Sequence, residues 1–271
     1  MQFYLGGIAL VVHGGAGASK DSEVGCVAAA EKGYARLRDG ADALSAAIEA
    51  VVALEDDPRF NAGSGSILRS DGITVESDAA VMDTRGRLGA VACLQRVRNP
   101  VLVARAVADT RHWLLAGEGA LRFAREHGFA DYDLAAHARR PKPGARETDT
   151  VGAVAVDCDG HFAVAASTGG ASPALPGRIG DTPIIGCGYY AGPAGAIAAT
   201  GLGEHIAAHM LARTVYDWIA AGIPLQEALD RGVALFPGTI DVGLIGLTRD
   251  SAAVASNRPM PTHCLSERRP R

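Results

Sequence analysis

Residues 147–157, ETDTVGAVAVD, mark the point at which the character of the chain changes most sharply. The preceding sequence contains AAHARRPKPGARE, a basic stretch with two prolines and a glycine that lacks apolar periodicity. Residues 131–149 are therefore predicted to form an exposed, flexible linker. From Thr150 onward the residues are small or β-branched, which predicts a strand that starts directly after the linker.

This strand is expected to be the first half of a β-hairpin. Thr150–Asp157 and Phe162–Ser167 are both strand-like, and Asp159-Gly160 between them is a turn signal. The second strand leads into Ser167-Thr168-Gly169-Gly170. Because a tight hairpin folds the chain back on itself, it can bring Thr168 beside Thr150.

The rest of the chain alternates between strand-like and helix-like segments. Strands are predicted at Ile8–His13, 72–83, 86–97, twice within 184–200, and as a last hairpin at Ile240–Thr248 and Ala252–Asn257. Helices are predicted at Asp21–Arg38, Asp42–Leu54 with Asp42 as N-cap, Pro100–Val107, Trp113–His127, Glu204–Ala221 and Pro224–Phe236. The tail HCLSERRPR (263–271) is expected to fray. This order indicates a layered sandwich of helices and mostly antiparallel sheets.

The composition excludes several classes of protein. The 271 residues are 48% apolar and 21% charged, which suffices for a buried core and excludes disorder. A net charge of -4 gives no reason to expect a nucleic-acid partner. Charged residues or glycine interrupt every apolar run too early for a membrane span. The five scattered cysteines lack a CxxC pair, so they are read as reduced thiols of a cytoplasmic protein.

Thr150 is the first candidate for chemistry. A threonine hydroxyl is a poor nucleophile unless a base lies beside it. If the chain were cut before Thr150, the new α-amine would be that base, because its pKa is about 7.7–8.0 rather than the roughly 10.4 of lysine. The triplet DTV alone would fit an ordinary β-branched residue at the start of a strand.

Two later segments add polar groups that suit such a site. LPGRIGDTP (175–183) places Arg178 and Asp181 three residues apart, and opposite charges at that spacing can hold both ends of an amino-acid zwitterion. Thr200-Gly201-Leu202-Gly203 precedes a predicted helix, and the backbone N–H groups of such a turn suit an oxyanion.

Taken together, these segments resemble the plant-type asparaginase and isoaspartyl peptidase family of N-terminal nucleophile hydrolases. The resemblance covers nearly the whole chain. Its motifs are VHGGAGA (12–18), LEDDPRFNAGSGS (54–66), ESDAAVMD (76–83), RNPVLVARAV (98–107), GEGA (117–120), DTVGAVAVD (149–157), STGG (167–170), LPGRIGDTP and TGLGE (200–204).

The resemblance implies an α+β fold, a four-layer αββα sandwich in a single domain over residues 1–271. It implies that Thr150 is the nucleophile and that autocleavage between Asp149 and Thr150 yields an α chain, 1–149, and a β chain, 150–271. Thr168 matches the hydroxyl that hydrogen-bonds the nucleophile, and Asn61 lies close to the nucleophile in relatives.

The resemblance also implies how the substrate is bound. Arg178 matches the residue that binds the α-carboxylate, and Asp181 the one that binds the α-amine. Thr200 and Gly201 match the oxyanion-binding and amide-binding pair, and Gly203 is expected to line the same pocket. The implied substrates are L-asparagine and β-aspartyl dipeptides.

The resemblance further implies a homodimer of αβ units without an organic or redox cofactor. A structural sodium ion is implied in the loop after residue 53. Its ligands would be the backbone carbonyls of Leu54, Glu55, Asp57, Phe60, Ala62 and Ser64.

Three alternatives remain open. Asp149 stands where many relatives have glycine, and an Asp-Thr junction resembles glycosylasparaginases and threonine aspartases. The STGG and LPGRIGD motifs are more similar to the asparaginase branch. A third alternative is a homologue that binds aspartate without cleaving itself.

Other residues give weaker signals. His205 and His209 are four residues apart on a predicted helix, but no third metal ligand is indicated. The resemblance implies that His13 is structural support near the nucleophile. Asp78 and Asp83 are predicted to face opposite sides of one strand, which argues against an acid–base pair. Gly14–Gly17 lacks the lysine of a phosphate-binding loop.

Overall fold

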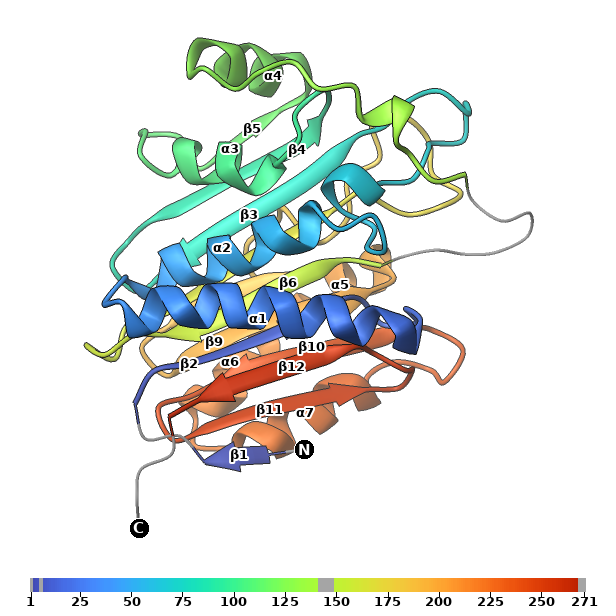
Figure 1. Ribbon diagram of the computed structural model, residues 1–271. Coiled ribbons are helices and arrows are strands. Elements are labelled where there is room, and N and C mark those ends of the chain that lie inside the picture. Colours follow the sequence, from blue (N-terminus) through green and yellow to red (C-terminus); the bar gives the residue numbers. More distant parts are fainter. Residues whose placement is uncertain (1, 5–6, 141–148, 268–271) are drawn as a thin grey trace.

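The computed structural model describes residues 2–4, 7–140 and 149–267 (Figure 1). This part of the chain contains seven α-helices and two β-sheets, which confirms the α+β class. None of its helices is long and apolar enough to cross a membrane.

The larger sheet has seven strands, and it carries the hairpin predicted from residues 150–168. Its order is β12 (Thr262–Ser266), β2 (Ala9–His13), β6 (Val151–Val156), β7 (Phe162–Thr168), β3 (Ser77–Asp83), β4 (Leu88–Leu94) and β5 (Leu114–Ala116). Neighbouring strands are antiparallel except for the parallel pair β4 and β5.

The smaller sheet has five strands, all antiparallel to their neighbours. Its order is β1 (Gln2–Tyr4), β11 (Ser251–Ser256), β10 (Val242–Leu247), β9 (Gly195–Gly201) and β8 (Tyr189–Gly192).

Helices pack on each sheet (Figure 1). α1 (Glu23–Arg38), α2 (Ala43–Glu55), α3 (Pro100–Val107) and α4 (Gly117–Glu126) contact strands of the larger sheet. α5 (Gly203–His209), α6 (Leu211–Ala220) and α7 (Leu225–Ala234) contact strands of the smaller one.

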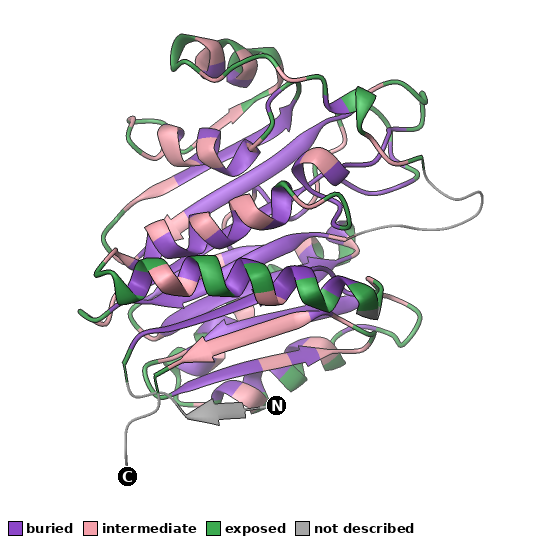
Figure 2. Cartoon of the chain, in the orientation of Figure 1, coloured by how far each residue is buried: buried purple, intermediate pink, exposed green. Residues whose placement is uncertain are grey.

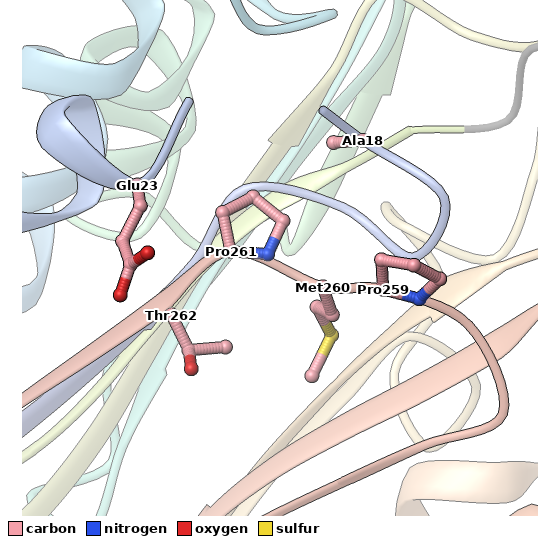
Figure 3. A pocket seen from close by; sticks show the side chains of 6 residues that line it. All are labelled: Ala18, Glu23, Pro259, Met260, Pro261 and Thr262. Atoms are coloured by element: carbon pink, nitrogen blue, oxygen red, sulfur yellow. The ribbon is translucent and has the colours of Figure 1, made fainter. Parts of the chain in front are cut away.

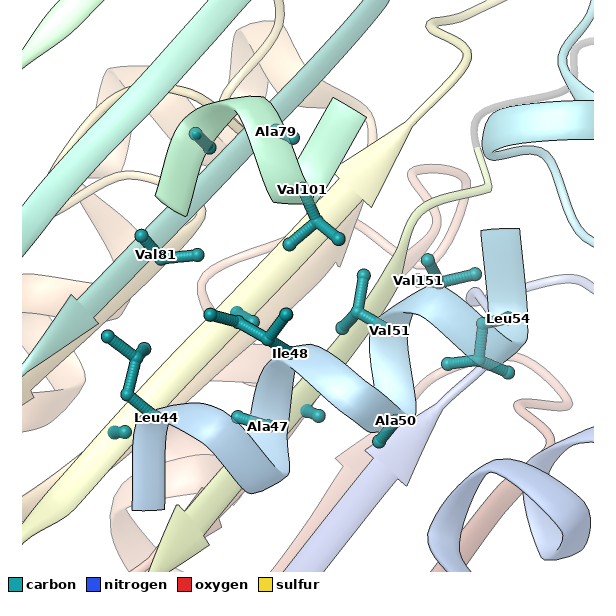
Figure 4. Packing of buried hydrophobic residues seen from close by; sticks show 14 of the residues in the cluster. Leu44, Ala47, Ile48, Ala50, Val51, Leu54, Ala79, Val81, Val101 and Val151 are labelled. Carbon is teal, nitrogen blue, oxygen red and sulfur yellow. The ribbon is translucent and has the colours of Figure 1, made fainter. Parts of the chain in front are cut away.

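Alternating side chains of the strands fill separate hydrophobic clusters. On β6, Val151, Ala153 and Ala155 join the cluster that contains side chains of α1 and α2. Figure 4 shows Val151 of this cluster near Val51 and Leu54 of α2. The intervening Val154 and Val156 pack with residues of the smaller sheet, including Tyr189 and Ile245. Since side chains of a strand alternate between its two faces, a strand buried on both sides needs the unbroken apolar run that follows Thr150. Figure 2 shows this buried interior running through both sheets.

Several predicted elements are confirmed. The helix at Pro100–Val107 has the predicted bounds. Asp42 caps α2, because its Oδ1 accepts a hydrogen bond of 2.7 Å from the Ser45 N–H. The hairpin of β6 and β7 pairs Val151 with Ser167.

Other predictions were wrong in part. The first residues of the predicted helix Trp113–His127 form β5 instead. The predicted helix Glu204–Ala221 is interrupted at Met210, whose φ of 43° is left-handed. Residues 263–266 of the tail do not fray, because they belong to β12, which pairs with β2; residues 268–271 lie outside the described part.

The predicted linker, 131–149, is described only at its two ends. Leu134–Ala136 form a short 3-10 helix with Leu134 buried, and Arg139 forms a β-bridge with Ile67. Residues 141–148 lie outside the described part of the chain.

Candidate active site

The predicted nucleophile lies at an edge where several strands of the larger sheet begin or end. Thr150 directly precedes β6, Thr168 ends β7, and His13 ends β2. Since β6 is antiparallel to both neighbours, these three residues come to the same edge. Thr150 is only 3% exposed.

The peptide carbonyl before Thr150 is held by two donors. The Asp149 carbonyl oxygen accepts hydrogen bonds from Asn61 Nδ2 at 3.1 Å and from Thr168 Oγ1 at 3.0 Å. Both donors are themselves fixed by Gly170, whose carbonyl accepts from Asn61 Nδ2 at 2.6 Å and whose N–H donates to Thr168 Oγ1 at 3.0 Å. This arrangement places two donors on the oxygen that would gain negative charge if Thr150 attacked the peptide bond.

Asn61 reaches this position because its loop turns back sharply. Gly63 has a φ of +51°, and a Cβ there would lie 2.5 Å from the Glu55 carbonyl oxygen. The Asn61 side chain is fully buried, and its Oδ1 accepts from the Ile67 N–H at 3.2 Å. A Cβ at Gly169 would lie 2.5 Å from Asn61 Oδ1, so glycine is needed where STGG passes the side chain.

The glycine loop after β2 connects Asp149 with Thr200. Gly15 has a φ of +109°, and a Cβ there would lie 2.8 Å from Asp149 Oδ1. The next residue, Ala16, donates its N–H to Thr200 Oγ1 at 3.4 Å. Thr200 and Gly201, at the end of β9, thus lie at the same loop as the Asp149-Thr150 junction.

A groove of about 210 Å³ lies beside the end of this loop (Figure 3). None of its lining residues is a predicted site residue. They are Ala18, Glu23, Pro259, Met260, Pro261 and Thr262.

His13 is a neutral, buried support for the strand that carries Thr150. A Cβ at Gly152 would overlap its ring, so β6 passes directly against the imidazole. Burial lowers the pKa of His13 to about 3, and the Thr150 backbone offsets only part of this effect. An imidazole that stays uncharged fits the predicted structural role.

Arg178 and Asp181 lie close together around Gly203. A Cβ at Gly203 would lie 2.8 Å from both Arg178 Nη2 and Asp181 Oδ1, so glycine lets the two side chains approach. Asp181 is buried, which raises its pKa to about 7, although the charge of Arg178 opposes the rise. Asp181 Oδ2 has no hydrogen-bond partner among the described residues.

Sequence reasoning missed the role of Glu204. Its carboxylate takes two hydrogen bonds from Arg178, Nε to Oε1 and Nη2 to Oε2, both at 2.9 Å. The Glu204 side chain is 59% exposed, whereas the Arg178 side chain is 16% exposed. The position of Glu204 directly after TGLG, in the first turn of α5, was the available signal. The pairing demonstrates that the Arg178 fork accepts a carboxylate in two-pronged geometry.

Asp78 is a second buried carboxylate near this cluster. Its Oδ1 accepts from the Cys93 N–H at 2.8 Å, and it pairs in register with Thr168. Burial raises its pKa to about 6, opposed by the Cys93 N–H and the charge of Arg69. Asp83 lies at the other end of β3 and pairs with Arg87, so the two aspartates form no acid–base pair.

The remaining histidine candidates stay apart from these groups. His205 and His209 are exposed on α5, and the His209 ring packs against Phe236. Over residues 2–4, 7–140 and 149–267, no three His, Cys, Asp or Glu side chains gather as a metal site.

Comparison with known proteins gives consistent matches. A family model described as asparaginase matches residues 6–142 and 133–262. A Danio rerio protein named isoaspartyl peptidase/L-asparaginase is 42% identical over 262 residues, covering 88% of this chain and 84% of its own. A Homo sapiens protein of the same name is 39% identical, covering 93% and 91%. A Pyrococcus furiosus protein named plant-type L-asparaginase is 40% identical, covering 84% and 85%.

Proposed function

The chain belongs to the asparaginase family, and from this premise we propose that it is an autoprocessing amidohydrolase. Its substrates are the side-chain amide of L-asparagine and the β-aspartyl bond of isoaspartyl dipeptides. The observation that carries the proposal is the Asp149 carbonyl, which Asn61 and Thr168 both hydrogen-bond directly before Thr150.

Self-cleavage uses these two donors. Thr150 Oγ attacks the Asp149 carbonyl carbon, and the negative charge that develops on the carbonyl oxygen is stabilised by Asn61 Nδ2 and Thr168 Oγ1. The C–N bond then breaks, the hydroxyl proton passes to the Thr150 nitrogen, and an ester joins Asp149 to Thr150. Water hydrolyses this ester and leaves the α chain, 1–149, and the β chain, 150–271, with a free amine on Thr150.

The substrate zwitterion is held by Arg178 and Asp181. The α-carboxylate takes the Arg178 fork that Glu204 occupies in the free protein. Asp181 binds the α-ammonium, because its buried Oδ2, which lies beside Gly188, has no hydrogen-bond partner among the described residues. The nearby charge of Arg178 favours the ionised form of this carboxyl, because it lowers its pKa. These contacts direct the side-chain carbonyl of the substrate toward Thr150.

Hydrolysis then proceeds through a covalent intermediate. Thr150 Oγ attacks the side-chain carbonyl while the Thr150 amine accepts the hydroxyl proton. Thr200 Oγ1 already accepts the Ala16 N–H, which leaves its hydroxyl hydrogen for the oxyanion, together with Gly201. Ammonia or the leaving amino acid takes the proton and departs, and water hydrolyses the β-aspartyl ester.

The assembly that we propose around this site follows the family resemblance. The fold is a four-layer αββα sandwich, supported by the cluster between the two sheets and by the helices packed on each. Two αβ units form a homodimer. We place the protein in the cytoplasm because all five cysteines are unpaired.

We also propose a structural sodium ion in the loop that carries Asn61. The ligands are the backbone carbonyls of Leu54, Glu55, Asp57, Phe60, Ala62 and Ser64. The loop is tight enough for this role, because Gly63 approaches the Glu55 carbonyl and Gly65 approaches the Phe60 carbonyl. Carbonyl oxygens suit a hard cation. The ion orders the loop and takes no part in the reaction.

A denaturing gel of the purified protein tests the central claim. Two bands smaller than the 27.8 kDa chain and a second N-terminus Thr-Val-Gly-Ala are expected. One uncut band that still binds L-aspartate would instead favour a non-cleaving aspartate-binding homologue. Assays with L-asparagine, β-Asp-Leu and glycan-linked asparagine separate the proposed activity from that of a glycosylasparaginase.

A further inference from the structure

Arg69 is the largest fully buried side chain in the described part of the chain, yet it takes no part in the proposed reaction. Its Nε lies 3.2 Å from Glu76 Oε2, an ion pair with side-chain exposures of 0% and 7%. Its Nη2 donates to the backbone carbonyls of Glu76 at 3.3 Å and Arg178 at 3.4 Å. Burying a guanidinium costs free energy unless its charge and N–H groups find partners, so this placement needs a reason.

Glu76 completes the attachment to the loop that carries Arg178. Its Oε2 accepts the Gly177 N–H at 2.8 Å. The two members of one buried ion pair therefore bind two consecutive residues of this loop: Glu76 holds the Gly177 N–H and Arg69 holds the Arg178 carbonyl. This fixes the backbone from which the Arg178 side chain projects.

The guanidinium also fits closely under Gly170. Gly170 has a φ of +89°, and a Cβ there would overlap Arg69 Nη1. Nη1 has no hydrogen-bond partner among the described residues. Arg69 thus fills the space between the STGG turn and the Arg178 loop, which are the two segments that meet at the site.

We propose that the Arg69–Glu76 ion pair positions Arg178 for binding the α-carboxylate of the substrate. It holds the Gly177-Arg178 backbone so that the Arg178 guanidinium meets the α-carboxylate in two-pronged geometry. Arg69 acts through Arg178 and touches neither the substrate nor Thr150. This inference rests on the proposed function, because it assigns Arg178 to the α-carboxylate.

The test compares Arg69→Met with a matched control, Arg87→Met. Arg87 pairs with Asp83 and Asp42 at the opposite end of β3, so its loss removes a comparable ion-paired arginine away from the site. The measurements are KM and kcat for L-asparagine, and the Kd for L-aspartate by calorimetry. The binding measurement needs no turnover.

Losing the hydrogen bond from Arg69 to the Arg178 carbonyl should weaken binding of the α-carboxylate. Arg69→Met should raise KM and the Kd for L-aspartate roughly tenfold, or about 1.4 kcal/mol, because the Arg178 carbonyl loses the hydrogen bond that holds this backbone in place. The value of kcat should change little, because uniform binding is what is lost. Arg87→Met should leave all three constants close to those of the wild type.

A second comparison shows whether Arg69 acts through Arg178. In an Arg178→Lys background, adding Arg69→Met should raise the Kd for L-aspartate little further, because lysine cannot form the two-pronged contact that Arg69 supports. The proposal would be overturned if Arg69→Met raised the Kd for L-aspartate by the same factor in both backgrounds. It would also be overturned if Arg87→Met raised this Kd as much as Arg69→Met does.

If Arg69→Met does not fold, Glu76→Gln takes its place. This variant keeps an oxygen for the Gly177 N–H but removes the charge opposite Arg69, so the Kd for L-aspartate should still rise. An unchanged Kd would contradict the proposal. If the wild type binds L-aspartate but neither cleaves itself nor hydrolyses L-asparagine, the proposed function fails while the positioning role is still decided by calorimetry.

Discussion

Asn61 Nδ2 lies 3.1 Å from the carbonyl oxygen of Asp149, although 88 residues separate the two in sequence. The carbonyl belongs to the peptide bond before Thr150, and Thr168 Oγ1 donates to the same oxygen at 3.0 Å. The carbonyl oxygen of the bond that we propose is cleaved therefore has two hydrogen-bond donors. Self-cleavage should therefore depend on these two donors.

The Thr168 hydroxyl can be removed almost without changing the shape of its side chain. Thr168→Val should slow self-cleavage by about 10²- to 10³-fold, the usual effect of losing one oxyanion donor. Thr168→Ser keeps the hydroxyl and should cleave at close to the wild-type rate. Band intensities on a denaturing gel over time measure both rates. Equal rates for the valine and serine variants would show that the hydroxyl is not an oxyanion donor.

Asn61→Ala should slow cleavage to a similar extent, because it removes the second donor to Asp149. It also leaves the Ile67 N–H without its partner Asn61 Oδ1, so a loss of about 1–3 kcal/mol in stability is expected as well. Thermal unfolding of the uncut protein separates the two effects. A variant that is as stable as the wild type and cleaves as fast would argue against this role of Asn61.

Thr150→Ala should give a folded, uncut and inactive chain, because the attacking hydroxyl is gone. Thr150→Ser is the matched control: it keeps a hydroxyl and should still cleave itself. Mass spectrometry of both proteins reads the outcome directly. Cleavage of the alanine variant at the same bond would show that Thr150 is not the nucleophile.

Arg178→Ala and Asp181→Ala should each nearly abolish hydrolysis of L-asparagine while the protein stays folded. Removing one member of a buried charged pair costs about 2–5 kcal/mol, or roughly 30- to several thousand-fold in kcat/KM. Steady-state kinetics give the loss. As a control on the wild type, β-aspartyl substrates blocked at the α-carboxylate or α-amine should be poor. Equal turnover of a blocked substrate would favour an endopeptidase of the threonine aspartase kind.

The buried carboxyl of Asp181 should make stability depend on pH. Burial raises its pKa from 3.8 to about 7, so its protonated form is favoured in the folded state. The protonated Asp181 carboxyl therefore contributes at most about 4 kcal/mol to the free energy of unfolding. This contribution is fully present below about pH 4 and is lost as pH rises through 7. Asp181→Asn cannot ionise, so its gain in Tm over the wild type should be larger at pH 8 than at pH 5. The same difference in Tm at both pH values would contradict a raised pKa.

Local sequence patterns were sufficient for most helices and strands but not for all. The helix Pro100–Val107 and the N-cap Asp42 depend on residues that are adjacent in the chain. β12 escaped prediction because its residues are only half-buried and owe their strand conformation to pairing with β2. Met210 is left-handed although methionine by itself favours helix, and the N–H groups of Ala212 and Arg213 that follow it donate to the backbone carbonyls of Cys187 and Gly186.

The motifs identified in the sequence bring residues that are far apart in the chain to one edge of the larger sheet. The tight turns of FNAGSGS and STGG depend on their glycines, so these motifs and the residues in them could be identified from the sequence. The individual hydrogen bonds of the site could not. Glu204 with Arg178, Asn61 with the backbone carbonyl of Asp149, and Arg69 with the backbone carbonyl of Arg178 are contacts between distant segments. Such contacts depend on how the sheets and loops pack, and packing brings together residues that no local pattern relates.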